Sequence, residues 1–233
     1  MNHWLEWATS AKARQTVRHG ASLEACLPGM LLRVWQVLRA GNWRGMLGAT
    51  VIAGCLLACA EPKEGFKNTD LTGLSYARDF ALIDHTGKPR TLADFKGKAV
   101  VVFFGYTQCP DVCPTTMSEM AQVLAQLGPL ADKVQVIFIT LDPERDTPAV
   151  LAQYAPGFDR RFLALTGSLA QIDKTAQEFK VVYQKVPGKQ PGSYSVDHTA
   201  ASFVFDPQGR IRLYVRNGQG PEPLVHDLRM LLK

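Results

Sequence analysis

The segment AVVVFFGYTQCPDVCP, residues 99–114, joins a continuous apolar run to two closely spaced cysteines. The run is rich in β-branched and aromatic residues, which is typical of a strand that is buried on both faces of a sheet. Cys109 and Cys113 follow this strand with three residues between them. The pattern therefore predicts a central strand that leads into two thiols, which could be a disulfide couple, a metal clamp or inert core residues.

Strands and helices are predicted alternately on both sides of this segment. The predicted order is a hairpin around 80–90, a strand over 98–104, a helix over 115–127, a strand over 134–139, a helix over 147–154, a strand over 162–165, a helix over 168–179, a hairpin over 199–215 and a helix over 224–232. This order predicts an α/β domain of thioredoxin-like fold, with a central mixed β-sheet flanked by helices and an N-terminal β-hairpin extension.

The positive charge of the chain is concentrated in its first quarter. The whole chain carries a formal charge of +5, and residues 1–59 hold six basic and two acidic residues, which leaves 20 basic and 19 acidic residues after them. A folded part with a net charge of only +1 does not present the basic surface that nucleic-acid binding requires. We therefore expect no nucleic-acid partner.

The first 59 residues resemble an export leader. MLGATVIAGCLLACA, residues 46–60, is a short apolar run that follows a basic flank, as in a secretory signal. Leu56–Cys59 resembles a bacterial lipoprotein box, with Ile52–Cys55 as a competing match and an uncleaved anchor as the alternative, and Met30 is an alternative start. The predicted organisation is a leader or membrane anchor over 1–59, a linker over 60–73 and a domain over 74–233.

The number of cysteines favours a reactive pair over a disulfide that only stabilises the scaffold. Three of the five cysteines lie in the leader, so only Cys109 and Cys113 remain in the folded part. One pair is too few for a scaffold built on disulfides, a strategy of much smaller secreted domains. The two thiols lie at or before a helix N-terminus, where backbone dipoles lower a thiol pKa. Pro114 argues for an irregular loop there instead of a full helical turn.

Two thiolates suit Cu(I), Zn(II) or iron–sulfur chemistry, but they are an incomplete ligand set for most ions, so a metal site would need a third donor. His85 reads as a solvated turn residue and His226 as a half-buried helix residue. His198 ends a glycine- and proline-rich loop and opens a strand, but it lies 85 positions after Cys113, so only the fold could bring them together. From the residues alone, His198 stays one candidate among three.

Two further features have plain structural interpretations. The block LDPERDTP, residues 141–148, follows a strand end, where sites gather in open α/β sheets, but it also reads as a turn and a helix cap. Met117 and Met120 are soft copper ligands in principle, yet their helical spacing with neighbouring apolar residues favours core packing.

Several blocks together resemble the Sco/SenC family of thioredoxin-like copper proteins. FGYTQCPDVCP (residues 104–114) is similar to the cysteine motif of the family, DPERDTP (142–148) to a second block, and VDHT (196–199) to its histidine block. FALIDHTGK (80–88) and FKGK (95–98) fit as well, and all blocks occur in order over roughly residues 75–233.

The resemblance implies a function. Cys109, Cys113 and His198 would bind copper, as Cu(I) or Cu(II), and Asp142 would lie behind the ligands or face a partner. The protein would deliver copper to the copper-site subunit of cytochrome c oxidase, or keep the thiols of that binuclear site reduced, alongside other copper chaperones or thioredoxin-like reductants. It would be attached to the periplasmic face of the inner membrane in a bacterial cell envelope, by lipidated Cys59 or by an uncleaved N-terminal segment.

A second class of function stays open. Cys109 and Cys113 could act as a thiol–disulfide oxidoreductase without an obligatory metal, with Cys109 attacking and Cys113 resolving. Their three-residue spacer departs from the two-residue spacer of ordinary thioredoxins, which favours the metal clamp. A peroxidase function is weaker, because the threonine of peroxiredoxins stands three residues before the cysteine, whereas Thr107 stands two before Cys109.

Overall fold

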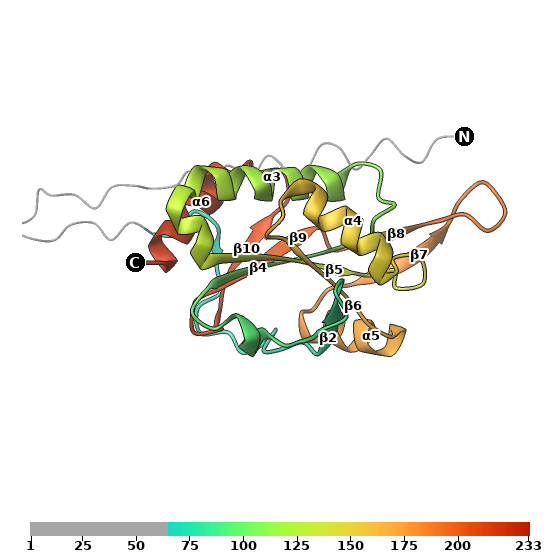
Figure 1. Ribbon diagram of the computed structural model, residues 1–233, viewed down its shortest axis with the longest axis horizontal. Helices are drawn as coiled ribbons and strands as arrows, with labels where there is room; N and C mark the ends of the chain where they lie inside the picture. The colour runs from blue at the N-terminus through green and yellow to red at the C-terminus, as the bar shows by residue number, and fades with distance from the viewer. Residues whose placement is uncertain (1–64) are drawn as a thin grey trace, which may run out of the picture. The chain divides into compact units, whose positions relative to one another are not determined.

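The computed structural model describes residues 65–233 (Figure 1). The predicted leader, with Cys55 and Cys59, and the first residues of the predicted linker lie outside the described residues. Within 65–233, no helix is both long enough and apolar enough to cross a bilayer.

An eight-stranded mixed sheet forms the centre of the domain, in the order β1-β10-β9-β4-β5-β6-β2-β3. The strands are β1 (Thr69–Asp70), β2 (Leu82–Asp84), β3 (Pro89–Arg90), β4 (Ala99–Gly105), β5 (Val134–Thr140), β6 (Leu163–Thr166), β9 (Ala201–Phe205) and β10 (Ile211–Arg216). β4, β5 and β6 are parallel, whereas β9 pairs antiparallel with β4, and β10 with β9. β2 and β3 form the predicted N-terminal hairpin, which joins the sheet edge through β6.

Helices cover both faces of this sheet, as predicted for a thioredoxin-like fold. In Figure 1, α3 (Val112–Leu127), α4 (Pro148–Phe158) and α6 (Glu222–Leu231) lie on one side of the sheet and α5 (Leu169–Glu178) on the other. Two 3-10 helices, η2 (Leu92–Phe95) and η3 (Gly128–Lys133), complete the set.

The alternation of side chains along β4 explains its unbroken apolar sequence. Val101 and Phe103 belong to the core under α3, α4 and α6, whereas Val100, Val102 and Phe104 belong to the core on the α5 side. A strand that is covered by helices on both faces gains from apolar residues at every position.

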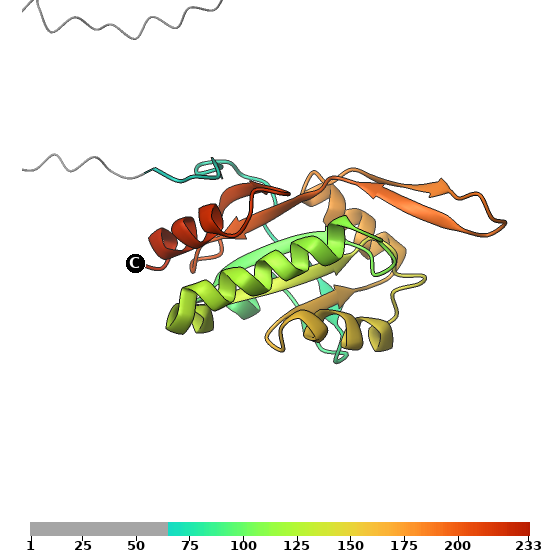
Figure 2. The same ribbon diagram turned by 90° about the horizontal axis from the view of Figure 1, so that it is seen from above.

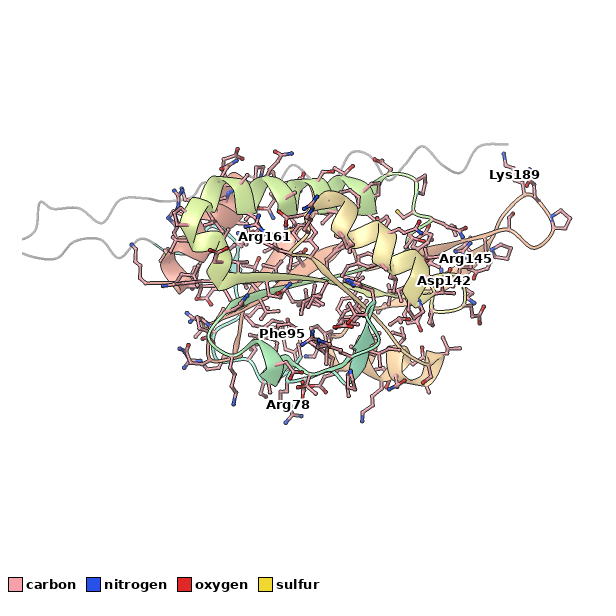
Figure 3. The ribbon with its side chains drawn as sticks, viewed as in Figure 1. Arg78, Phe95, Asp142, Arg145, Arg161 and Lys189 are labelled. Atoms are coloured by element: carbon pink, nitrogen blue, oxygen red, sulfur yellow. The ribbon has the colours of Figure 1, made fainter. Side chains whose placement is uncertain are left out.

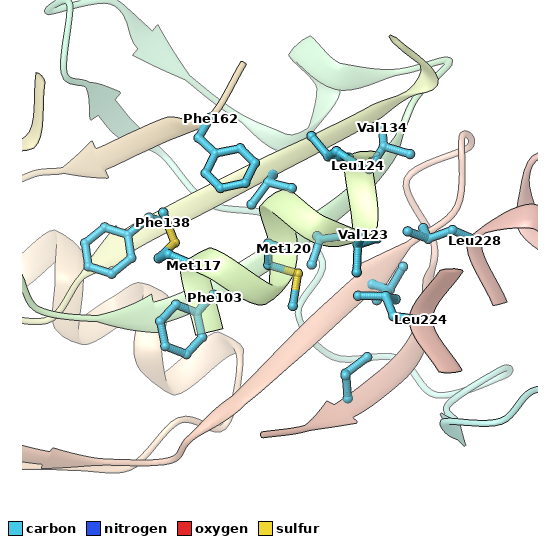
Figure 4. Close-up of a cluster of buried hydrophobic side chains, with 14 of the residues drawn as sticks. Phe103, Met117, Met120, Val123, Leu124, Val134, Phe138, Phe162, Leu224 and Leu228 are labelled. Carbon is cyan, nitrogen blue, oxygen red and sulfur yellow. The ribbon is translucent and has the colours of Figure 1, made fainter. Parts of the chain in front are cut away.

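The core under α3 contains the two methionines of this helix. Met117 and Met120 are buried and pack with Leu124, Phe138 and Leu224 (Figure 4). Their core role, which the helical spacing predicted, is confirmed.

Local sequence signals set two of the helix starts. The Thr147 hydroxyl accepts a hydrogen bond from the Val150 amide at the start of α4. Ser168 and Gln171 form a reciprocal cap at the start of α5, with the Gln171 side chain accepting from the Ser168 amide at 2.8 Å.

α3 starts earlier than the sequence indicated. Pro114 was expected to keep its segment irregular, but the helix begins at Val112 and includes Cys113 and Pro114 in its first turn. A proline in the first turn is tolerated because the first N–H groups of a helix have no partner within it.

Part of the predicted linker over 60–73 is packed on the domain. β1 lies within it and pairs with β10. The Asp227 carboxylate on α6 accepts the backbone N–H groups of Lys67 and Asn68, both at 2.9 Å. The linker prediction is wrong for these residues. Backbone pairing and one distant carboxylate hold them on the domain, and the flanking Phe66 and Leu71 pack against its core.

A two-stranded ribbon, β7 (Tyr183–Pro187) and β8 (Tyr194–His198), forms a separate sheet. Figure 2 shows that it extends away from the helices and the main sheet. The residues before His198 were predicted to be a loop, which is wrong for β8. Most side chains of the ribbon are exposed or only half-buried, and Val196 is the one buried residue of its two strands, so the ribbon lacks the apolar run of a core strand.

Candidate metal centre

The fold brings two of the three predicted donors into contact. Cys109 lies in the loop after β4, Cys113 in the first turn of α3 and His198 at the end of β8. The Cys113 Sγ and His198 Nε2 atoms are 3.9 Å apart, although 85 positions separate the residues. Cys109 and Cys113 are both free thiols and form no disulfide.

Cys113 occupies a tight apolar pocket at the end of β4. Its side chain is fully buried, and a Cβ atom added at Gly105 would lie 2.7 Å from its Sγ atom. Burial raises the pKa of Cys113 far above its ordinary value. A backbone hydrogen bond from Tyr106 lowers this pKa, but by less, and the neighbouring Cys109 raises it. Without a metal, Cys113 is therefore held as a neutral thiol.

Cys109 has the opposite character. It is half-buried, and burial alone would raise its pKa, but the backbone N–H groups of Asp111, Cys113 and Val112 outweigh that effect and lower the pKa below its ordinary value. These N–H groups belong to the start of α3, where a helix favours negative charge. Cys109 is thus the more accessible and the more readily ionised thiol.

His198 is prepared to act as a donor through Nε2. Its Nδ1 atom lies 3.0 Å from the Thr199 carbonyl oxygen, which only accepts, so Nδ1 carries the proton and Nε2 keeps its lone pair toward Cys113. Burial lowers the pKa of His198 below its ordinary value, which keeps the ring neutral. The ring packs edge-on against Phe103 and Tyr106, each with centroids 6.3 Å apart.

These donors fit a soft metal ion. With bond lengths like those of zinc, a sulfur and an imidazole nitrogen on one ion would lie about 3.6 Å apart at a tetrahedral angle and about 4.4 Å apart when linear. The 3.9 Å between Cys113 Sγ and His198 Nε2 falls within this range. Among residues 65–233, no three His, Cys, Asp or Glu side chains already converge as a closed metal cluster. Binding by all three donors would therefore require a small closing movement.

A buried carboxylate that sequence analysis missed holds the loop before Cys109. Asp146 is fully buried and accepts hydrogen bonds from the Thr107 amide at 2.9 Å, the Thr107 hydroxyl at 2.5 Å and the Thr140 hydroxyl at 2.6 Å. It lies in the DPERDTP block after β5. The signal that could have identified it is the position of this block, since β4 and β5 are parallel and end at the same edge of the sheet.

Asp142 lies behind the site and not at the surface. It is fully buried, and its carboxylate accepts the Tyr194 hydroxyl at 2.8 Å and pairs with Arg145. The expectation that it could face a partner is therefore wrong.

The other two histidines do not reach the thiols. His85 was expected to be solvated, but its Nδ1 atom accepts the Ala164 amide at 3.2 Å, which makes it part of the hairpin connection. His226 is half-buried on α6, as predicted, and its Nδ1 atom lies 2.8 Å from Asp227.

Comparisons with known proteins agree on one family. The family model described as SCO1/SenC matches residues 69–233. The mitochondrial SCO2 homolog of Bos taurus is 36% identical over 190 residues, which cover 79% of this chain and 71% of that protein. The structure of Bradyrhizobium japonicum ScoI with copper bound is 42% identical with a TM-score of 0.63, covering 68% of this chain and all of that one. The apo Sco1 structure from Thermus thermophilus is 41% identical with a TM-score of 0.66, and the match covers 73% of this chain and 99% of that one.

Proposed function

This chain belongs to the SCO1/SenC family, and from that premise we propose that it is a copper metallochaperone with Cys109, Cys113 and His198 as ligands. It delivers copper to the binuclear copper site of cytochrome c oxidase or keeps the thiols of that site reduced. The observation that carries the proposal is the 3.9 Å approach of the His198 Nε2 lone pair to the Cys113 sulfur. A relative of known structure, B. japonicum ScoI, holds copper.

The two thiols have different parts in this proposal. Cys113 is buried and retains the ion, whereas Cys109 is half-exposed and is the ligand that an incoming thiolate of a partner can replace. His198 supplies a neutral nitrogen, which Cu(II) favours more than Cu(I) does, since two thiolates already satisfy the softer ion. When bound, copper is the cargo, and the chain contributes the donors and the partly open access to them.

Titrations of the full chain test the ligand set. We expect His198→Ala to weaken Cu(II) binding at least about tenfold and Cu(I) binding much less, and the Cys109→Ser and Cys113→Ser variants to lose both ions. His85→Ala is the matched control, because His85 lies in the hairpin away from the thiols and should bind both ions like the unmodified chain. Equal losses of both ions in His198→Ala would contradict its assignment.

The asymmetry of the two thiols also favours a second function, thiol–disulfide exchange. The Cys109 thiolate would attack a partner disulfide and release one partner thiolate. Cys113 would then lose its proton and attack the Cys109 sulfur of the mixed disulfide, which releases the second partner thiolate. The products are a Cys109–Cys113 disulfide and a reduced partner. We expect Cys113→Ser to trap the mixed disulfide at Cys109 in the copper-free protein. A copper-free chain that reduces no disulfide peptide would exclude this function.

We also propose that the domain works at the periplasmic face of the inner membrane, attached through lipidated Cys59 or an uncleaved leader. The support is the basic flank and the apolar run before Cys59. Mass spectrometry of the membrane-bound protein should find a lipidated Cys59 at its N-terminus, or else the intact leader. A soluble protein with a free amino group at another cleavage site would contradict both.

A further inference from the structure

Side-chain contacts, and not strand pairing, hold the ribbon that carries His198 on the domain. Among the strands of residues 65–233, β7 and β8 pair only with each other and not with the main sheet. Tyr194, Val196 and His198 alternate along β8, so their side chains point to one face of it. Val196 is buried in the core and Tyr194 is half-buried, which identifies this face as the one toward the domain.

Two side chains connect the ribbon with the cysteine loop: Tyr106, whose ring packs against His198, and Arg145. Arg145 donates from Nη1 to the Tyr194 carbonyl oxygen and to the Gln108 side-chain oxygen, both at 3.0 Å. Gln108 directly precedes Cys109. The guanidinium also lies over the Tyr194 ring, with its central carbon 3.6 Å from the ring centroid.

Asp142 fixes this guanidinium from behind. Arg145 Nε pairs with one carboxylate oxygen of Asp142, and the other accepts the Tyr194 hydroxyl. Figure 3 shows Asp142 and Arg145 beside the base of the ribbon, with Lys189 at its tip. A planar guanidinium offers several donors in fixed directions, which a lysine cannot reproduce.

We propose that Arg145 is a positioning residue that fastens the β7–β8 ribbon to the cysteine loop and thereby holds His198 against Cys113. This inference rests on the proposed function for its effect on copper, but the fastening itself is a property of the metal-free chain. Without Arg145, the ribbon moves away from the loop more often, and His198 reaches the thiols in a smaller fraction of molecules.

The ribbon offers a matched control. Lys185 on β7 forms an exposed ion pair with Glu144 at 2.7 Å, and its nitrogen lies 4.7 Å from the Tyr194 ring centroid. This contact also joins the ribbon to the DPERDTP block, but it does not reach the cysteine loop. Exposed ion pairs contribute little, so Lys185→Met should leave His198 in place.

The first test is amide hydrogen exchange of the reduced, metal-free full chain. Arg145→Met should speed exchange in β8 and leave α5 as in the unmodified chain, and Lys185→Met should change neither. Because Arg145→Met leaves the buried Asp142 charge unpaired, the double variant Asp142→Asn/Arg145→Met repeats the test without that charge. Unchanged exchange in β8, or equal acceleration throughout the domain in both variants, would overturn the proposal.

The second test is copper binding. Arg145→Met should lower Cu(II) affinity by ~10- to 100-fold, as loss of supporting contacts typically does, with a much smaller loss for Cu(I). The imidazole nitrogen coupling in the Cu(II) electron paramagnetic resonance spectrum should weaken as in His198→Ala, and Arg145→Lys should restore little of it. A Cu(II) affinity equal to that of Lys185→Met would overturn the link to His198. If His198→Ala itself leaves Cu(II) affinity unchanged, the proposed ligand set is wrong. Hydrogen exchange alone then tests whether Arg145 fastens the ribbon to the cysteine loop.

Discussion

At the scale of single residues, the absence of one side chain makes room for the buried sulfur. Gly105 ends β4, and a Cβ atom there would lie 2.7 Å from Cys113 Sγ and 3.0 Å from the Phe138 ring. Neither neighbour has free space, because both belong to the same buried cluster. Only glycine at this position lets the thiol lie directly against the end of the central strand.

We therefore expect Gly105→Ala to destabilise the domain by about 1–3 kcal/mol, the usual cost of inserting a methyl group into a packed core, and to weaken copper binding. Urea denaturation and a copper titration would measure both effects. Gly157→Ala is the control, since Gly157 lies in α4 with nothing within 4 Å of an added Cβ and should gain stability from helix propensity. Equal stability of Gly105→Ala and the unmodified chain would contradict the steric argument.

The two thiols should also differ in reactivity. Cys109 is half-exposed with a lowered pKa, which the backbone N–H groups produce against the effect of burial, whereas burial raises the pKa of the fully covered Cys113. Because the thiolate is the reacting form and Cys113 is both neutral and covered, iodoacetamide at pH 7 should alkylate Cys109 more than about ten times faster. Peptide mass spectrometry of the reduced, metal-free protein would show it, and comparable rates would refute the asymmetry.

At the scale of elements, two tight turns use the same arrangement. Asp84, the last residue of β2, accepts the Thr86 and Lys88 amides at 2.8 and 3.1 Å. Asp206, after β9, accepts the Gln208 and Arg210 amides at 3.1 and 3.0 Å. In each, an aspartate side chain replaces backbone partners in the turn, so the hairpin does not depend on apolar packing alone.

This arrangement predicts a pH dependence of stability. Burial would raise the pKa of Asp84, but hydrogen bonds from Thr86, Arg90 and Lys88 outweigh it and hold the pKa far below its ordinary value. Its stabilising effect is therefore complete above the unfolded pKa of about 3.9 and is lost as the pH falls from there through the folded pKa.

Asp84→Asn should accordingly lower the free energy of unfolding by roughly 1.5–3 kcal/mol at pH 7, because charged hydrogen-bond acceptors contribute that much. The difference from the unmodified chain should shrink below pH ~4 in urea denaturation series. The exposed Asp132→Asn serves as the control and should show no such difference. A difference that is constant with pH would mean that the carboxylate charge is not responsible.

At the scale of the whole domain, one carboxylate connects its two ends in sequence. Asp227 on α6 accepts the Lys67 and Asn68 amides and the Asn68 side chain, across about 160 positions. These contacts fix where the chain enters the domain, next to its C-terminal helix.

Loss of this carboxylate should release the entering segment. We expect Asp227→Ala to expose the peptide bond after Lys67 to trypsin and to speed cleavage there at least about fivefold, as loss of roughly 1 kcal/mol of local stability would. Asp70→Ala is the control, since Asp70 accepts only from its neighbour Thr72 among the hydrogen bonds described. Unchanged cleavage after Lys67 would show that β1 pairing alone holds the segment.

The sequence by itself determined the type and order of most elements. The unbroken apolar run of β4, the helical spacing in α3 and the cap at Ser168 are local patterns, and local patterns report on burial and backbone hydrogen bonding. The same patterns missed the β7–β8 ribbon, whose two strands bury only Val196, and the packing of residues 67–70. Cys109 and Cys113 were recognisable because they are neighbours in sequence.

Only the tertiary structure decided which distant group meets these thiols. β9 pairs antiparallel with β4, with Phe103 opposite Ser202, so the chain just before β9 lies at the edge where β4 ends. This register places His198 against Cys113, and the parallel pairing of β5 places Asp142 and Arg145 at the same edge. Strand order and direction arise from pairing between segments that are remote in sequence. The apolar pattern of one segment shows that it is buried, but it does not specify which segment pairs with it.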